Sequence, residues 1–252
     1  EYLDTVSGLD AIENYKRRSH QLLNPEPGDH LLDMGCGTGD DVIMLAEHVG
    51  PDGLVFGIDR SESIIQTATD RSKNISNVSF WVDNALDLAL DSNVVDGCRS
   101  DRVLQHLPDP TIALAEMIRI TKPGCQVVMS EPNWNTLEVR IPIADADVTD
   151  EIIDIEWANE RNPRIGSQLY SLARKSGLTD IHVDPITVVI TDFEVAEQVF
   201  QLENRLKRVK EGDILADRSS KRWISQANQA DAKDIFFSSI SGFTVAGTVP
   251  EK

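Results

Sequence analysis

The chain is poor in cysteine, in aromatic residues and in positive charge. Among 252 residues it has three cysteines, 6% aromatic residues, and 24 lysines and arginines against 42 aspartates and glutamates. Cys36, Cys98 and Cys125 lie far apart and form no CxxC or Cys/His zinc pattern, so no metal site is expected and a reducing cytoplasm is favoured. The formal net charge of −18 works against docking on a nucleic acid or an anionic membrane surface. A nucleic-acid substrate is therefore disfavoured.

Long apolar runs and internal repeats are also lacking. No run approaches the ~20 apolar residues that a membrane-spanning helix needs, and the first residues show neither the basic nor the apolar region of a signal peptide. The sequence starts at Glu1 rather than Met, which leaves open that a leader was removed. With 40% hydrophobic and 26% charged residues, the composition is that of a globular protein. We expect one domain over residues 1–252, with no membrane span.

Apolar segments of strand length alternate with amphipathic segments of helix length over residues 28–131. A helical segment over 1–27 comes first and ends at a turn rich in proline and glycine. The expected strands are 30–34, 54–58, 78–82, 94–99 and 126–130, and the expected helices among them are 42–48, 61–73 and 111–121. Because strands that alternate with helices form parallel sheets, this pattern predicts a doubly wound, mostly parallel α/β sheet.

The alternation breaks after Ser130. The expected elements beyond it are a helix with Ser167 as its N-cap that stops at Gly177, strands at 181–190 and 243–249, and a helix over 219–232. Apolar residues at 4-3-4-3 spacing predict one further amphipathic helix, which packs as core between a lid and the sheet rather than as a dimer seam. They are Val195, Val199, Leu202, Leu206 and Val209. Residues 132–165 and 191–236 are therefore predicted to form a helical lid or substrate-binding segments.

The sequence LLDMGCGTGDD, residues 31–41, joins an apolar strand to the start of a helix through three glycines. Glycines permit positive φ angles and let the backbone approach a ligand closely. A dinucleotide fingerprint needs its third glycine where this chain has Asp40, and it offers helix amides to a pyrophosphate. The negative charges of Asp33, Asp40 and Asp41 would repel a pyrophosphate. The loop therefore favours a ligand that lacks phosphate and carries positive charge.

Five segments in order resemble the motifs of a known family. They are DMGCGTG, GIDRSESII, VSFWVDNALDL, DGCRSDRVLQHLPDP and TKPGCQVVMSEPNW, each expected at the end of a strand. Together they resemble class I S-adenosylmethionine-dependent methyltransferases, in particular the quinone-biosynthesis-like small-molecule methyltransferases. The resemblance extends over residues 31–134. It implies a Rossmann-like methyltransferase fold with a seven-stranded sheet, and S-adenosylmethionine as the cofactor.

The resemblance also implies which residues hold the cofactor. Asp59, about 20 residues beyond the loop, would accept both ribose hydroxyls, as one carboxylate can. Asn84 would face the adenine amino group with its side-chain carbonyl, and the Ala85 amide would reach a ring nitrogen. Asp83 stands where the family usually has glycine. The expected cofactor-binding residues are Asp33, Gly35, Gly37, Thr38, Gly39, Asp59, Arg60, Ile64, Asp83, Asn84, Ala85, Ser100 and Arg102.

Several features keep two interpretations each. His106 is a candidate catalytic base or a packed histidine, and Arg102 lines the mouth of the cofactor site or pairs with a neighbouring acid. Trp134 packs in the core or lid, or it stacks on a substrate. The acidic run 145–160 forms a solvated helix face, or its charge attracts a cationic acceptor. It can also pair within the chain, with the basic insert that starts at Arg205.

Methyl transfer from a sulfonium depends mainly on in-line alignment of the acceptor and exclusion of water. The chain has neither the NPPY-type element nor the Pro-Cys nucleophile of nucleic-acid methyltransferases that it otherwise resembles. We therefore expect S-adenosylmethionine-dependent methyl transfer to an oxygen, nitrogen or carbon atom of a small-molecule acceptor, under a lid. The alternatives are a cofactor-binding protein without turnover, and an NAD-type oxidoreductase, which the acidic loop disfavours.

Overall fold

The computed structural model describes residues 10–144, 146–154, 161–211 and 217–251. The chain divides into two compact units. We call Asn14–Pro132, Asn159–Ile186 and Gly242–Lys252 the sheet unit, and Glu1–Glu13, Asn133–Ala158 and Thr187–Ser241 the helical unit. The glycine loop and every residue expected to bind a cofactor belong to the sheet unit.

Seven strands form one sheet in the order β3-β2-β1-β4-β5-β7-β6. Their bounds are β1 His30–Met34, β2 Leu54–Asp59, β3 Val78–Val82, β4 Val95–Asp101, β5 Thr121–Arg140, β6 Thr179–Ile190 and β7 Phe237–Thr248. β1 pairs in parallel with β2 and β4, β2 with β3, and β4 with β5, which confirms the expected doubly wound, mostly parallel sheet. Because β2 and β4 lie on opposite sides of β1, the carboxyl ends of β1 and β4 flank the topological switch point, where open α/β sheets bind ligands.

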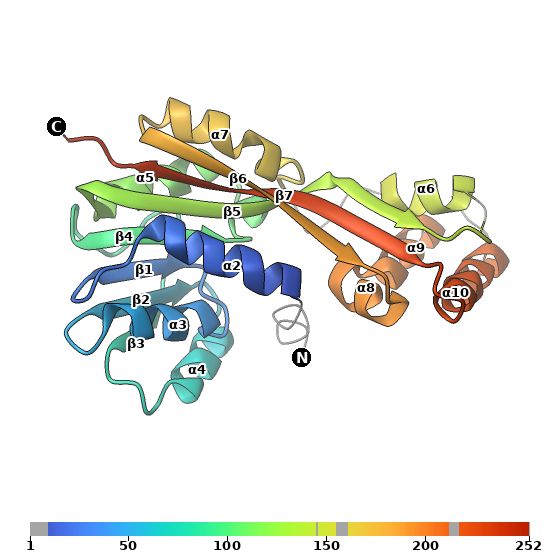
Figure 1. Ribbon diagram of the computed structural model, residues 1–252, viewed down its shortest axis with the longest axis horizontal. Helices are drawn as coiled ribbons and strands as arrows, with labels where there is room; N and C mark the ends of the chain where they lie inside the picture. The colour runs from blue at the N-terminus through green and yellow to red at the C-terminus, as the bar shows by residue number, and fades with distance from the viewer. Residues whose placement is uncertain (1–9, 145, 155–160, 212–216, 252) are drawn as a thin grey trace. The chain divides into compact units, whose positions relative to one another are not determined.

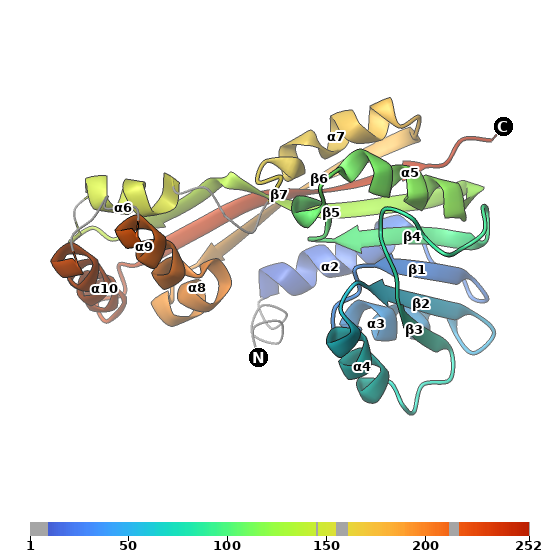
Figure 2. The ribbon, with the colours of Figure 1, turned by 180° about the vertical axis from the view of Figure 1, so that it is seen from behind.

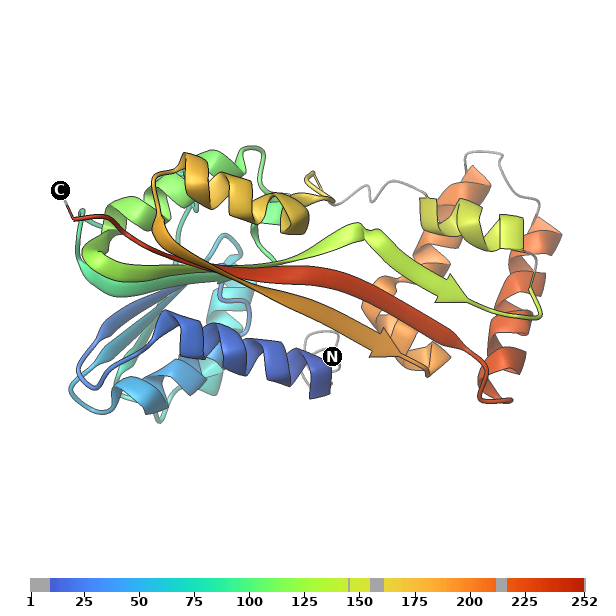
Figure 3. The same cartoon turned by 45° about the horizontal axis from the view of Figure 1, so that its top comes forward.

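Strand β7 runs against its neighbours. Gln126 Nε2 of β5 donates to Thr248 Oγ1 of β7 over 2.9 Å, and the hydroxyls of Ser130 and Thr244 are 2.8 Å apart. The residue numbers therefore fall along β7 as they rise along β5, which is the antiparallel arrangement. Figure 3 shows the red β7 pointing the opposite way to β5 and β6. The sheet is thus parallel except for this one strand.

Helices cover both faces of the sheet. Adjacent residues of β1 separate the two faces, because side chains alternate along a strand: Leu31 packs with α3 residues and Leu32 with α5 residues. The first face carries α2 Asp10–Leu23, α3 Asp40–Val49 and α4 Glu62–Arg71, and the second carries α5 Pro110–Ile120 and α7 Ile165–Lys175. Figures 1 and 2 show these two layers from the front and from behind. Both faces are buried, as expected for strands rich in leucine, isoleucine and valine.

Local sequence explains where two of these helices begin. Asp109 Oδ1 accepts the Thr111 backbone N–H over 2.9 Å, and Pro110 is the first residue of α5. Ser61 Oγ accepts the Ile64 N–H over 3.4 Å at the start of α4. Both caps satisfy backbone donors that have no partner inside the helix. Each helix therefore starts directly after the residue that its sequence signal indicates.

The helical unit has a core of its own. Its helices are α6 Ala146–Asp154, α8 Phe193–Phe200, α9 Leu202–Glu211 and α10 Asp217–Asp231. The Phe193 ring lies edge-on to Trp223 and to Phe236, with ring centroids 6.1 and 5.4 Å apart. The buried Arg205 donates from Nη1 to the Ile153 carbonyl over 2.7 Å, which satisfies the last turn of α6.

Two expected helices differ from the structure. The single amphipathic helix over 195–209 is wrong: Gln201, with a φ angle of 51°, separates α8 from α9. Leu202 and Leu206 are buried in α9, whose neighbours within the helical unit are α6, α8 and α10, so the stripe forms the core of that unit. Ser167 is not an N-cap, because α7 begins at Ile165 and the Ser167 hydroxyl donates to the Arg164 carbonyl inside the first turn.

Other expectations fall partly on residues that the structure does not describe. The N-terminal helix is α2, and residues 1–9 of the expected segment 1–27 lie outside the described residues. In the acidic run, α6 covers 146–154, while Asp145 and residues 155–160 lie outside. The side chain of Val209 is likewise not described.

Candidate functional site

The glycine loop joins β1 to α3 at the carboxyl edge of the sheet. Gly35, Gly37 and Gly39 have φ angles of 78°, 54° and 85°, in the left-handed region that disfavours side chains. A Cβ atom at Gly35 would lie 2.3 Å from a methyl carbon of Val103. The N–H groups of Gly35 and Cys36 both donate to the Ile58 carbonyl over 2.8 Å. These contacts fix the path of the loop and explain why glycine is needed at position 35.

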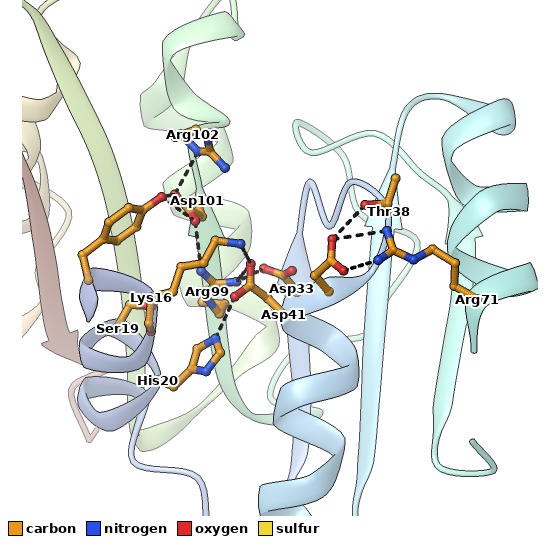
Figure 4. Close-up of polar contacts among 12 residues, drawn as sticks. Lys16, Ser19, His20, Asp33, Thr38, Asp41, Arg71, Arg99, Asp101 and Arg102 are labelled. Carbon is orange, nitrogen blue, oxygen red and sulfur yellow. Dashed lines mark hydrogen bonds and ion pairs between the residues drawn. The ribbon is translucent and has the colours of Figure 1, made fainter. Parts of the chain in front are cut away.

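A buried arginine lies beneath this loop. Arg99, in β4, is 1% exposed and is the Cα partner of Asp33 in β1. Its Nη1 lies 3.0 Å from Asp33 Oδ1 and 3.2 Å from Asp41 Oδ2, and its Nη2 lies 3.5 Å from Asp101 Oδ2. One guanidinium thus contacts carboxylates from the end of β1, the start of α3 and the end of β4 (Figure 4).

Helix α2 adds three side chains to this network. Lys16 Nζ donates to Asp41 Oδ2 over 2.8 Å, and His20 Nε2 lies 3.0 Å from Asp41 Oδ1. The Tyr15 hydroxyl donates to the carboxylate of Asp101, 3.1 Å from Oδ2. Figure 4 shows Lys16 and His20 pointing from α2 toward Asp41. The network therefore links α2 to the glycine loop and to the end of β4.

Burial and charge perturb the pKa values in this network. Burial raises the pKa of Asp33 to about 7, against the attraction of Arg99. At Asp41 burial also acts to raise the pKa, but Arg99, the hydrogen bond from His20 and Lys16 together hold it well below its usual range. Burial lowers the pKa of His20, which favours the neutral imidazole at neutral pH. Asp41 is thus the firmly ionised carboxylate of the cluster.

The acidic residues of the glycine loop are paired within the protein. Asp33 and Asp41 contact Arg99, and Asp40 Oδ1 lies 2.6 Å from Arg71 Nη2 of α4. The Thr38 hydroxyl donates to Asp40 Oδ2 over 2.9 Å. The expectation that these aspartates present unbalanced negative charge to a ligand is therefore corrected, because internal cations neutralise much of it.

Asp59 ends β2, one strand away from the glycine loop. Its Oδ1 accepts the Ser61 backbone N–H over 2.9 Å, and its carbonyl accepts the Asp83 N–H over 3.1 Å. The side chain is half-buried, while Arg60 is exposed and Ile64 is half-buried in the first turn of α4. The structure places all of these residues at the same edge of the sheet as the glycine loop.

The turn after β3 is organised by Asp83. Its Oδ1 accepts the Asn84 N–H over 2.8 Å, and its Oδ2 accepts from Trp81 Nε1 over 3.2 Å and from the Ala89 N–H over 3.1 Å. The Asn84 side-chain carbonyl accepts the Leu86 N–H over 3.1 Å, and the Asn84 side chain is exposed. The carbonyl expected to face an adenine amino group thus already has one donor. Ala85 is half-buried.

The end of β4 carries the remaining expected residues. Ser100 is buried, and its hydroxyl has no hydrogen-bond partner in the described part of the chain. Arg102 has a φ angle of 56°, which is rare for arginine, and its Nε lies 3.6 Å from Asp101 Oδ1. His106 is exposed in η1, a short 3₁₀ helix at Leu104–His106. Ser100 and Arg102 therefore lie at the switch point, and His106 one turn beyond it.

Glu131 supports the same loop from β5. It is 1% exposed, and its Oε1 accepts the Val103 and Leu104 N–H groups over 2.8 and 2.6 Å. Its Oε2 is buried and has no hydrogen-bond partner among the described residues. Burial raises the pKa of Glu131 to about 8, against the effect of the two amides. Burial therefore favours the neutral form of this carboxyl at neutral pH.

Sequence reasoning missed the supporting side chains around these residues. The missed residues are Tyr15, Lys16, His20, Arg99 and Glu131. Arg99 could have been noticed because it is a charged residue inside an apolar strand. Glu131 could have been noticed because it is an acidic residue directly after an apolar strand. The signal on α2 was the i, i+4 spacing of Lys16 and His20, which places both on one face. Their partners could not be read from the sequence, because these lie on other elements.

Neither a membrane span nor a metal cluster is found where the structure can be searched. In the described ranges, no helix has the length and apolar character needed to cross a bilayer. The same residues contain no group of three or more histidine, cysteine, aspartate or glutamate side chains placed to hold a metal ion.

Three comparisons with known proteins bear on this site. A 37.1 kDa protein of Streptomyces fradiae, described as uncharacterized and found in transposon TN4556, is 36% identical over 250 residues, which cover 97% of this chain and 69% of that protein. Demethylmenaquinone methyltransferase of Staphylococcus carnosus is 34% identical over 137 residues, covering 54% of this chain and 57% of that protein. The crystal structure of the YcgJ protein from Bacillus subtilis matches with a TM-score of 0.65 at 14% identity, over 95% of this chain and 100% of that chain.

The family comparison covers the sheet unit most fully. A methyltransferase domain matches residues 25–175, more than half of the chain and nearly all of the elements that carry the glycine loop, Asp59 and the end of β4. The solved structure shares the fold, and the Staphylococcus carnosus relative carries a methyltransferase name. The chain belongs to the methyltransferase domain family and is a class I S-adenosylmethionine-dependent methyltransferase.

Proposed function

We propose that this chain transfers the methyl group of S-adenosylmethionine to an oxygen, nitrogen or carbon atom of a small-molecule acceptor. The observation that carries the proposal is the convergence of the glycine loop, Asp59 and Arg102 at the carboxyl edge of the parallel strands, beside the switch point. The acceptor class rests on the resemblance to small-molecule methyltransferases and on the net charge of −18, which disfavours nucleic acid.

The residues at this edge fit the cofactor chemically. Asp59 has one carboxylate oxygen engaged by a single amide, and a carboxylate accepts several hydrogen bonds, so capacity remains for a ribose diol. The glycine loop keeps its backbone free of Cβ atoms at three positions with positive φ. Bound S-adenosylmethionine would supply an electrophilic methyl group on a sulfonium. We therefore assign Asp59 to the ribose and the loop to the methionine part of the cofactor.

The turn after β3 would hold the adenine. Asn84 and Ala85 follow Asp83, which fixes the turn through three hydrogen bonds. Because the Asn84 carbonyl already accepts the Leu86 N–H, the adenine amino group would have to share that oxygen. A carbonyl oxygen has two lone pairs, so sharing is chemically allowed.

The chain's own contribution to rate would be positioning and exclusion of water. His106 is the candidate base, and its exposure in η1 suits contact with solvent or an acceptor. The lid assigned to residues 132–165 and 191–236 stays a prediction, as does the cytoplasmic location. The buried stripe of α9 already packs inside the helical unit, so any acceptor contact must come from other side chains.

Two measurements, made one after the other, test the proposal. Titration calorimetry should show binding of S-adenosylmethionine and S-adenosylhomocysteine at micromolar affinity, about −8 kcal/mol, and weaker binding of NAD. Tighter binding of NAD would overturn the cofactor assignment in favour of an oxidoreductase. A screen with methyl-labelled cofactor and a metabolite extract should then yield a labelled small molecule. Cofactor binding without any labelled product would favour the alternative, a binding protein without turnover.

A further inference from the structure

Arg99 is a charged side chain in the interior of the sheet. It lies in β4 between Cys98, which is fully buried, and Ser100, and it is itself 1% exposed. Removing an ionised group from water is costly unless oppositely charged groups surround it. Arg99 has three such groups, Asp33, Asp41 and Asp101. These carboxylates balance the guanidinium charge without any ligand, while Arg99 Nε has no hydrogen-bond partner among the described residues. The role of Arg99 therefore lies in the residues that it holds together.

Two of the three carboxylates mark the two ends of the glycine loop. Met34 is the last residue of β1, and Asp33 comes directly before it. Asp41 is the second residue of α3. The loop residues 34–40 lie between them in sequence. Nη1 of Arg99 contacts both, at 3.0 Å and 3.2 Å. One nitrogen atom therefore bridges the points where the loop starts and ends.

The hydrogen bonds of Gly35 and Cys36 to the Ile58 carbonyl hold the start of the loop, but its glycines give the rest of the loop little intrinsic rigidity. Three of its seven residues are glycines, which are free to adopt many backbone conformations, so a ligand would have to order the loop on binding if nothing held it. Helix α2 reinforces the far end of the bridge, since Lys16 and His20 contact the same Asp41 carboxylate. The loop is thus held at Asp33 by one cation and at Asp41 by two cations and an imidazole.

We propose that Arg99 is a positioning residue for S-adenosylmethionine, which sets the distance between the two ends of the glycine loop through Asp33 and Asp41 before the cofactor binds. Arg99 is buried beneath the loop and does not itself touch the cofactor. The inference rests on the proposed function, because it assumes that the loop holds the cofactor. It predicts that Arg99 affects cofactor affinity through loop order, beyond any effect on global stability.

The test compares variants of Arg99 with a control that destabilises the fold elsewhere. Arg99→Lys keeps a cation but loses the planar fork, and Arg99→Met removes the charge. Ile120→Ala is the matched control, because Ile120 is fully buried and lies where α5 meets the start of β5, at the opposite edge of the sheet. For each variant, thermal melting, the dissociation constant of S-adenosylhomocysteine and amide hydrogen exchange are measured at a temperature at which it is folded.

We expect Arg99→Met to weaken S-adenosylhomocysteine binding by ~10–100-fold and Arg99→Lys by ~3–10-fold, since each loses part of the preorganisation of the loop. Amides of residues 34–40 should exchange faster in both variants. Ile120→Ala should melt earlier yet bind within about twofold of the unaltered chain, because its loop supports are intact. If Arg99→Met does not fold, Arg99→Lys decides the question by the same measurements.

The possible failures are distinguishable. If the unaltered chain does not bind S-adenosylhomocysteine, the proposed function fails. If it binds and folded Arg99 variants bind equally well with unchanged loop exchange, the proposed function stands and the positioning role of Arg99 is overturned. If Ile120→Ala loses affinity as much as Arg99→Lys at a similar melting temperature, Arg99 acts only through stability and the inference is again overturned.

Discussion

The buried polar side chains of the two units hold different kinds of segment in place. In the sheet unit, Arg99 bridges the two ends of the glycine loop through Asp33 and Asp41, and Glu131 links β5 to the segment after β4 by accepting the N–H groups of Val103 and Leu104. In the helical unit, the buried Arg205 instead completes the end of a single helix, α6. Among the described residues, these buried polar groups of the sheet unit fix segments of the candidate site, whereas Arg205 fixes the end of a helix outside it.

The largest expected effect comes from removing the charge at the centre of the sheet unit. Arg99→Met leaves Asp33 and Asp41 buried with fewer counter-charges, so the free energy of unfolding should fall by ~3–5 kcal/mol. Arg205→Met in the helical unit should cost ~1–3 kcal/mol, since it leaves backbone carbonyls short of a donor. Urea unfolding of both variants measures the contrast. Equal losses would mean that buried charge serves the two units alike.

A second contrast uses pH. The pKa of Glu131 is raised to about 8 from an ordinary value of 4.5, so its neutral form stabilises the fold. That stability is complete below the ordinary value and is lost as pH rises toward about 8, at ~1.4 kcal/mol per pH unit. Glu131→Gln should make the pH dependence shallower between the two values, and the slope that remains belongs to the other perturbed groups, such as Asp33 with its pKa raised to about 7. The matched control is Glu138→Gln, an exposed glutamate paired with Arg140, which should leave the slope unchanged.

Urea titrations at several pH values provide the measurement for Glu131. The same pH dependence in the unaltered chain and in Glu131→Gln would show that Glu131 is ionised in the folded state. The geometry would then need a cation near Oε2.

Cofactor affinity provides the third contrast. Asp59→Ala should weaken S-adenosylhomocysteine binding by ~10–100-fold while the fold stays intact, because a charge-assisted hydrogen bond is worth ~1.5–3 kcal/mol. Trp134→Ala in the helical unit should leave that affinity within about twofold and lower turnover instead. Calorimetry and a methyl-transfer assay separate the two. Equal loss of cofactor affinity in both variants would mean that the helical unit belongs to the cofactor pocket.

The smallest expected effect concerns His106. If alignment supplies most of the rate, His106→Gln should lower kcat by less than about tenfold, below the ~10²–10⁴ typical of a general base. The pH profile of kcat in the variant should match that of the unaltered chain. A loss within the typical range, together with disappearance of a kinetic pKa, would identify His106 as a base.

The sequence predicted the order of the strands because each signal is local, but β5 and β7 are longer than the expected strands 126–130 and 243–249, and β5 extends to Arg140 within the segment 132–165 that was expected to be helical. The apolar run of β1 and the cap and proline before α5 depend on neighbouring residues, and both elements formed within a residue or two of expectation. The break at Gln201 was missed because the apolar spacing continues across it, so periodicity alone predicts one helix. Gln201 adopts a left-handed backbone conformation, which glutamine does not favour by itself, so the surrounding tertiary structure sets it and the sequence does not predict it.

In the candidate site, too, the residues in contiguous motifs were predicted and those that depend on distant partners were missed. Glycines and Asp59 were recognisable because the family motif is contiguous in sequence. Arg99 was not, since its meaning depends on Asp33, which is 66 residues away and adjacent only once β1 and β4 pair. Sequence reasoning missed the pairing of the loop aspartates with internal cations for the same reason, because those cations lie on other elements.

The contact between Gly35 and Val103 has a consequence for how this family can vary. The two residues belong to different loops that flank the switch point, and only the absence of a Cβ at Gly35 leaves room for the valine methyl 2.3 Å from where that atom would stand. A bulkier residue at 103 would therefore displace the first loop as surely as a side chain at 35. Relatives that enlarge position 103 should carry compensating changes in the first loop, so the two positions should drift together over evolutionary time.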